Sequence, residues 1–159
     1  MTLKETREQY SISQMNAANS VGVPLRTYVR YENDNSYGSS LKRQSMINVL
    51  NSIYEITEEK GLYSIAMIKE IVYEVIIEKY KESVEYCYLF GSYAKGYAKE
   101  SSDIDLCVSC SLKGFEFTGL VEALRNALKK KVDVIRLSDL SNNVELINEI
   151  MKDGIKIYG

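Results

Sequence analysis

Two short β-rich runs with a polar stretch between them constrain the fold of this chain more than any other feature. The first, VEYCYLF at 84–90, is rich in β-branched and aromatic residues and stops at Gly91. The second, DIDLCVS at 103–109, alternates polar and apolar side chains, the period of a strand with one buried face. We expect two strands, joined through a short helix over SYAKG, the residues after Gly91.

Helical and strand patterns alternate on both sides of these runs. Helical spacing of apolar residues predicts helices at 64–80, 115–130 and 144–152, and further strands are expected at 132–136 and 155–158. This order indicates an α/β or α+β domain with a mixed sheet, which we assign to residues 62–159.

The front of the chain has a different pattern. Helices are expected at 2–10, at 13–21, over LRTYVRYEN with Pro24 in its first turn, and at 41–56. Gly22 supplies a tight turn between the second and third of these, which is a helix-turn-helix signature. We expect residues 1–58 to form a small all-α domain, followed by a junction at EEKG, 58–61.

Composition excludes several classes of function. The chain has no histidine, which rules out His-dependent triads, HExxH zinc sites and a His general base. A net charge of −2 gives no overall basic field for nucleic acid. No signal peptide or long apolar run is evident, so we expect a cytoplasmic protein outside the membrane. The three cysteines, Cys87, Cys107 and Cys110, are then expected to pack as apolar residues rather than to bind zinc or act in redox chemistry.

Three aspartates interrupt the predicted strands. Alternation places Asp103 and Asp105 on one face of a strand, and Asp133 in VDVIR offers a third carboxylate from a neighbouring strand. A lone aspartate would be read as a strand-end residue facing water, but three converging carboxylates repel one another unless a cation lies between them. Oxygen-only ligands favour Mg²⁺, with Mn²⁺ as a substitute.

The turn before these aspartates suits a phosphate. Gly91 permits a tight turn and a close approach to the backbone, and Ser92 adds a hydroxyl donor at the start of a helix. Alone, such a turn is often a mere connector. Combined with the aspartate pair, it supplies the second half of a nucleoside-triphosphate site.

Gly91-Ser92, ten intervening residues and Asp103-Ile-Asp105 resemble the GSx10DxD signature of the minimal nucleotidyltransferases, in the polymerase-beta-like superfamily. The likeness covers about residues 64–159. It implies an α/β (α+β) nucleotidyltransferase domain that uses ATP and two Mg²⁺ ions. The implied roles are triphosphate binding for Gly91, Ser92 and Lys95, metal binding for Asp103, Asp105 and Asp133, and in addition a base role for Asp133 toward the attacking hydroxyl. The family more often has an arginine where this chain has Lys95. A lysine can neutralise a phosphate but cannot form the bidentate hydrogen bonds of a guanidinium.

Residues 3–33 resemble the helix-turn-helix of Xre/Cro-type repressors. The likeness rests on Ser13-Gln14, Ala17, Gly22-Val23 and the ending Tyr31-Glu32-Asn33. It implies contacts with operator DNA from Gln14, Arg26, Thr27 and Arg30. The alternative is a docking or dimerisation module, since Asn19-Ser20 replaces commoner charged residues and the domain is only mildly basic.

Minimal nucleotidyltransferases with this motif resemble the antitoxin halves of toxin–antitoxin modules. That resemblance implies a HEPN-type toxin as partner, a complex of the two proteins, transfer of AMP to a toxin tyrosine, and autoregulation through the front domain. Two alternatives stay open. One is a small-molecule nucleotidyltransferase of the aminoglycoside type, which we disfavour because only about 26 residues follow Asp133. The other is a non-catalytic antitoxin that acts by binding alone, which the intact aspartates disfavour.

Overall fold

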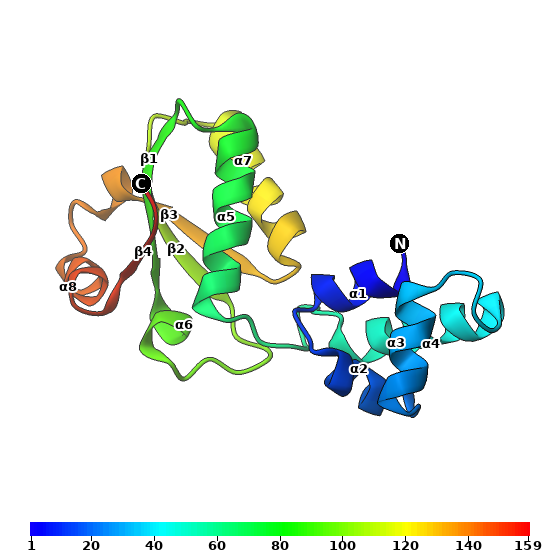
Figure 1. The fold of residues 1–159 in the computed structure, drawn as a ribbon. Coiled ribbons are helices and arrows are strands. Elements are labelled where there is room, and N and C mark those ends of the chain that lie inside the picture. The colour runs from blue at the N-terminus through cyan, green and yellow to red at the C-terminus, as the bar shows by residue number, and fades with distance from the viewer. The chain divides into compact units, whose positions relative to one another are not determined.

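The computed structural model describes residues 1–159, and the chain divides into two compact units, Met1–Glu55 and Ile56–Gly159. The first unit is entirely helical and the second combines helices with one sheet (Figure 1). None of the helices has both the length and the apolar character needed to span a membrane.

The second unit follows the element order expected from sequence, with one addition. Its elements are α5 (Ile65–Lys79), β1 (Val84–Phe90), α6 (Gly91–Lys95), β2 (Ile104–Cys110), α7 (Phe115–Leu128), β3 (Val132–Arg136), the 3-10 helix η1 (Leu137–Leu140), α8 (Val144–Asp153) and β4 (Ile155–Tyr158). The addition is η1, whose four residues carry too little pattern for periodicity to detect.

The sheet has the strand order β3-β2-β1-β4. Strand β1 is antiparallel to β2 and β4, whereas β2 and β3 are parallel, so the predicted mixed sheet is confirmed. Helices α5 and α7 cover one face, and α8 lies on the other (Figure 1). Strand β3 is therefore an edge strand, and only β2 pairs with it.

Alternation along the strands divides the side chains between the two faces. Ile104 and Leu106 belong to the main core beneath α5 and α7, where fully buried aliphatic side chains stabilise the fold by about 1.5–3 kcal/mol each. Cys107 instead belongs to a smaller cluster with Phe90 and Ile150 of α8. By the same alternation Asp105 projects toward the α8 face.

Three details of the predicted elements are corrected. Strand β2 begins at Ile104, so Asp103 lies just before the strand rather than within it. Helix α7 ends at Leu128 rather than at residue 130, because Lys129 adopts a left-handed backbone with φ 52° and closes the helix. Pro24 is the N-cap of its helix, one residue earlier than expected.

The cysteines bear out the packing prediction in part. Cys87 and Cys107 are buried among apolar residues on opposite faces of the sheet, and Cys110 is half-buried at the end of β2. All three are free thiols.

The first unit contains α1 (Leu3–Gln9), α2 (Gln14–Val21), α3 (Leu25–Asn33) and α4 (Ser40–Tyr54). Gly22 ends α2 in the left-handed conformation at φ 72°, which lets the chain turn tightly into α3. Its core is a cluster of buried side chains from all four helices: Leu3, Ala17, Ala18, Tyr28, Tyr31, Met46, Ile47 and Leu50.

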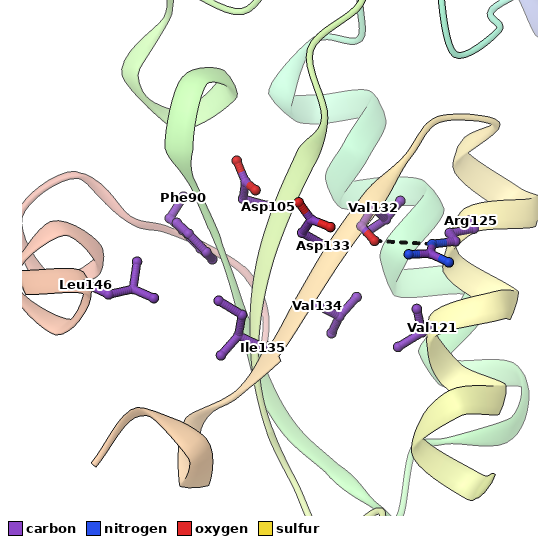
Figure 2. Close-up of a pocket in the computed structure, with 9 residues that line it drawn as sticks. All are labelled: Phe90, Asp105, Val121, Arg125, Val132, Asp133, Val134, Ile135 and Leu146. Atoms are coloured by element: carbon purple, nitrogen blue, oxygen red, sulfur yellow. Dashed lines mark hydrogen bonds between the residues drawn. The ribbon is translucent and has the colours of Figure 1, made fainter. Parts of the chain in front are cut away.

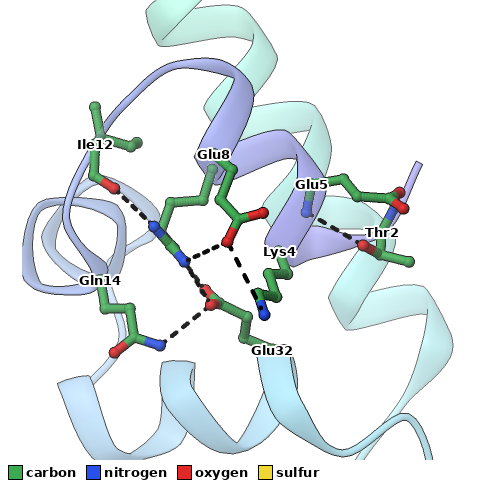
Figure 3. Close-up of polar contacts among 8 residues, drawn as sticks. Thr2, Lys4, Glu5, Glu8, Ile12, Gln14 and Glu32 are labelled. Carbon is green, nitrogen blue, oxygen red and sulfur yellow. Dashed lines mark hydrogen bonds and ion pairs between the residues drawn. The ribbon is translucent and has the colours of Figure 1, made fainter.

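A buried ion pair joins α1 to α3 in this unit (Figure 3). Arg7 donates through Nε and Nη2 to the two carboxylate oxygens of Glu32, both at 2.9 Å, and through Nη1 to the carbonyl of Ile12. Gln14 Nε2 donates to Glu32 Oε1 at 3.1 Å. Burial alone would raise the pKa of Glu32, but the hydrogen bonds from Arg7 and Gln14 outweigh burial and lower it.

Candidate active site

The turn at the end of β1 is built against an aspartate of β2. Phe90 pairs with Asp105 in the antiparallel register, so Gly91 enters α6 directly beside that carboxylate. Gly91 has φ 72°, and a Cβ at this position would collide with the side-chain carboxylate of Asp105. Both the backbone conformation and the packing therefore require glycine.

Asp105 and Asp133 are brought side by side. They are direct partners in the register of the parallel strands β2 and β3. Figure 2 shows the two carboxylates next to each other on neighbouring strands. Asp105 is half-buried, whereas Asp133 is exposed to solvent.

Asp105 lies in an environment that disfavours its charge. Burial raises its pKa to about 6, and repulsion from Asp133, Asp103 and Glu149 adds to the rise. Three other carboxylates thus disfavour the charge of Asp105, and a divalent cation beside it would relieve that repulsion. The donor set, made only of oxygens, fits Mg²⁺ or Mn²⁺.

Asp103 has a lysine as its partner. Its Oδ2 lies 3.4 Å from Lys131 Nζ, in a pair whose side chains are 37% and 59% exposed respectively. No three acidic or cysteine side chains gather closely enough to coordinate one metal ion. The structure thus pairs Asp105 with Asp133, and leaves the carboxylate of Asp103 with a lysine.

The predicted phosphate-binding residues lie on α6. Ser92 is half-buried, one residue into the turn, and its carbonyl accepts from the backbone N–H groups of Gly96 and Tyr97. Lys95, at the last position of the helix, places its Nζ 2.6 Å from Glu149 Oε1 of α8.

Glu149 is the site residue that sequence reasoning missed. It contacts Lys95 and acts electrostatically on Asp105, although it lies 44 positions beyond Asp105 in the chain. Its only sequence signal is membership of an amphipathic helix, which does not distinguish it from Glu145 of the same helix.

A pocket of about 510 Å³ opens beside the two paired aspartates and runs along the edge strand β3 (Figure 2). Its lining is mostly apolar, with Asp105, Asp133 and Arg125 as the charged members. The remaining lining residues are Phe90, Val121, Val132, Val134, Ile135 and Leu146. Arg125 donates from Nε to the carbonyl of Val132 at 3.3 Å, which holds its guanidinium at the rim.

The predicted DNA-binding residues lie on α2 and α3 of the first unit. Arg26 and Arg30 are exposed and Thr27 is half-buried, all three on α3. The guanidinium of Arg30 lies over the ring of Tyr37, 4.0 Å from its centroid. The amide nitrogen of Gln14 is already engaged with Glu32.

The sequence is similar to those of known proteins. The family described as polymerase beta, nucleotidyltransferase matches residues 69–159, more than half of the chain. A protein of Methanocaldococcus jannaschii named "Putative protein adenylyltransferase" is 36% identical over 86 residues, which cover 50% of this chain and 84% of that protein.

Solved structures resemble part of the chain. One described as "Structure of putative minimal nucleotidyltransferase" matches with a TM-score of 0.50 at 23% identity, over 60% of this chain and 97% of the other. This likeness shows a shared fold. A crystal structure of a toxin–antitoxin with AMP-PNP matches with a TM-score of 0.49 at 26% identity, over 57% of this chain and 73% of the other.

Proposed function

The chain belongs to the polymerase beta nucleotidyltransferase family, and on that premise we propose that it is a protein adenylyltransferase acting as an antitoxin. It transfers AMP from ATP to a tyrosine hydroxyl of a HEPN-type toxin, with which it forms a complex, and so silences the toxin. The observation that carries the proposal is the pairing of Asp105 with Asp133 beside the Gly91 turn, at the rim of an open pocket. The name of the M. jannaschii relative supports a protein as the acceptor.

The turn and the aspartates divide the chemistry between them. The backbone at Gly91 and Ser92 holds the triphosphate, and Lys95 neutralises one of its phosphates. The tyrosine oxygen attacks the α-phosphorus, the bond to the bridging oxygen of pyrophosphate breaks, and the phenolic proton passes to the exposed carboxylate of Asp133. Asp105 and Asp133 would hold Mg²⁺, and Asp103 could join them only if its carboxylate left Lys131. The metal, when bound, would stabilise the charge that develops on the phosphate oxygens.

The pocket favours an acceptor presented by another protein. It is open, mostly apolar and placed along the edge of the sheet, where an aromatic side chain can reach Asp133. A sugar or polyamine acceptor has many polar groups, each of which costs free energy when it is buried without a hydrogen-bond partner, and this lining offers few such partners. We therefore prefer a tyrosine to a small-molecule acceptor.

The test is to incubate the protein with ATP, Mg²⁺ and the product of the adjacent gene, and then to weigh that product by mass spectrometry. We expect an increase equal to one or more AMP groups on a tyrosine. Asp105→Asn and Asp133→Asn should lower the transfer rate by about 10²-fold or more while the proteins stay folded. Glu116→Gln, which changes an exposed carboxylate at the start of α7, should leave the rate unchanged. Tight co-purification without an adduct would instead favour inhibition by binding alone.

For the first unit we propose a helix-turn-helix domain over residues 1–58 that binds the operator of its own operon, with residues 62–159 as the catalytic domain. The exposed positions of Arg26 and Arg30 on α3 support contacts with DNA. Gln14 could join them only if its amide left Glu32 or used its oxygen.

A gel-shift titration with the operator at low salt tests this second proposal, because phosphate contacts are strongest there. The double change Arg26→Ala and Arg30→Ala should weaken binding at least tenfold. Lys4→Ala on α1 removes one positive charge and serves as the control for each single change, Arg26→Ala and Arg30→Ala. No shift at any concentration with the unchanged protein would favour a docking or dimerisation module.

A further inference from the structure

Helix α8 brings an acidic side chain to the phosphate-binding turn. Glu149 Oε1 lies 2.6 Å from Lys95 Nζ, and the two side chains are only 31% and 28% exposed. Glu149 lies on α8, the helix that covers the face onto which Asp105 projects, and its ion pair with Lys95 joins α8 to α6 (Figure 1). The one cation on α6 is therefore already paired with a carboxylate.

The ion pair affects the pKa of Lys95, and Glu149 also affects the pKa of Asp105. The hydrogen bond from Lys95 to Glu149 raises the pKa of Lys95, with smaller contributions from Tyr97 and Asp153, so the lysine stays charged. Glu149 also adds to the repulsion that raises the pKa of Asp105. Glu149 thus adds negative potential near Lys95, where the phosphates of a nucleotide would lie.

A bound triphosphate and Glu149 would both pair with the ammonium group of Lys95. The three N–H donors of an ammonium can serve several acceptors, but a compact point charge lowers its energy most beside the strongest anion. A bound triphosphate carries several negative charges and would lie beside the carboxylate of Glu149. If Glu149 kept its position, its carboxylate would repel the phosphates and would also compete with them for Lys95.

We propose that Glu149 competes with the triphosphate for Lys95, so that Lys95 passes from Glu149 to a phosphate oxygen when ATP binds and returns when pyrophosphate leaves. This inference rests on the proposed role of Lys95 in phosphate binding. Glu149 is then a specificity-determining residue that weakens binding of ATP and speeds release of pyrophosphate. Glu149 has little effect on the affinity for AMP, because AMP lacks the two outer phosphates.

The experiment measures binding of AMP-PNP with Mg²⁺ to the full chain by calorimetry, and of AMP alongside it. Glu149→Gln keeps the size of the side chain and removes its charge. We expect this variant to bind AMP-PNP about two- to fivefold more tightly than the unchanged protein, the scale of a partly exposed ion pair. Binding of AMP should change by less than that. Glu145→Gln, on the same helix but exposed, is the matched control and should leave both affinities unchanged.

Lys95→Met separates the failure of this inference from the failure of the site itself. We expect it to weaken AMP-PNP binding and to reduce the gain from Glu149→Gln in the double variant. If Lys95→Met weakens binding while Glu149→Gln alone has no effect or also weakens it, Glu149 only supports Lys95 and the competition is wrong. If Lys95→Met leaves the affinity unchanged, Lys95 does not bind phosphate and its proposed role fails. Thermal unfolding of each variant without nucleotide shows that it is folded.

Discussion

Gly91 lies directly against the carboxylate of Asp105, with no room for a side chain between them. The turn that would hold a phosphate and the aspartate that would hold a metal ion are therefore one packed unit. A side chain at position 91 would therefore displace the carboxylate of Asp105.

Gly91→Ala should abolish nucleotide transfer and lower the free energy of unfolding by about 1–3 kcal/mol. The added methyl group meets Asp105, and alanine is strained at φ 72°. Gly96→Ala is the matched control, because Gly96 has φ 84° but a methyl group there would meet no other atom within 4 Å. Gly96→Ala should lower the free energy of unfolding in a urea titration, because alanine is strained at this φ, but it should retain most of the transfer rate. Equal loss of transfer in both variants would contradict the packing argument.

Asp105→Asn should make the protein more stable at neutral pH, in buffer that contains EDTA. The pKa of Asp105 is raised to about 6 in the folded protein from 3.8, so the folded state holds a proton that the unfolded state releases. Stability is thus lost as the pH rises from about 4 to about 6, and the loss is complete above pH 6. Asparagine removes that loss. The shift corresponds to about 3 kcal/mol, and solvent screening of the half-buried carboxylate lowers the expected gain to about 2 kcal/mol. Urea titrations at several pH values measure the free energy of unfolding of both proteins. If this free energy changed with pH in the same way for both, the expectation would be wrong.

Lys130→Met should destabilise the second unit by about 2–4 kcal/mol. Lys130 is 2% exposed, and its Nζ donates to the carbonyls of Thr57, Glu58 and Glu100. Methionine fills a similar volume but leaves these acceptors unpaired. Because Glu100 lies in the loop before Asp103, the transfer rate should also fall.

Lys129→Met is the control for this change. It removes the same charge from an exposed neighbour, so both stability and transfer should stay close to those of the unchanged protein. Thermal unfolding followed by circular dichroism would refute the role of Lys130 if both variants melted together.

Arg7→Met should destabilise the first unit by about 3–5 kcal/mol, because it leaves Glu32 as an unpaired buried charge. The Glu32 side chain is only 1% exposed. Lys4→Met breaks the pair with Glu8, whose side chains are 56% and 53% exposed, and should cost less than about 0.5 kcal/mol. Urea titrations of the two variants measure the difference. Similar midpoints would show that the Arg7–Glu32 pair contributes little.

Local patterns in the sequence determined the elements of this protein. Alternation located β2 to within one residue, and helical spacing located α5 and α8, because both patterns record which side chains a local element buries. The family motif at Gly91, Ser92, Asp103 and Asp105 indicated a nucleotidyltransferase, and the family match agrees.

Only the tertiary structure decided which side chains meet. The parallel register of β2 and β3 places Asp133 beside Asp105, whereas Asp103 lies outside the strand and pairs with Lys131. The contact of Lys95 with Glu149 joins α6 to α8, which are far apart in the chain. Periodicity reports the burial of a residue but not its partner, because the partner depends on how strands pair and how helices pack on the sheet.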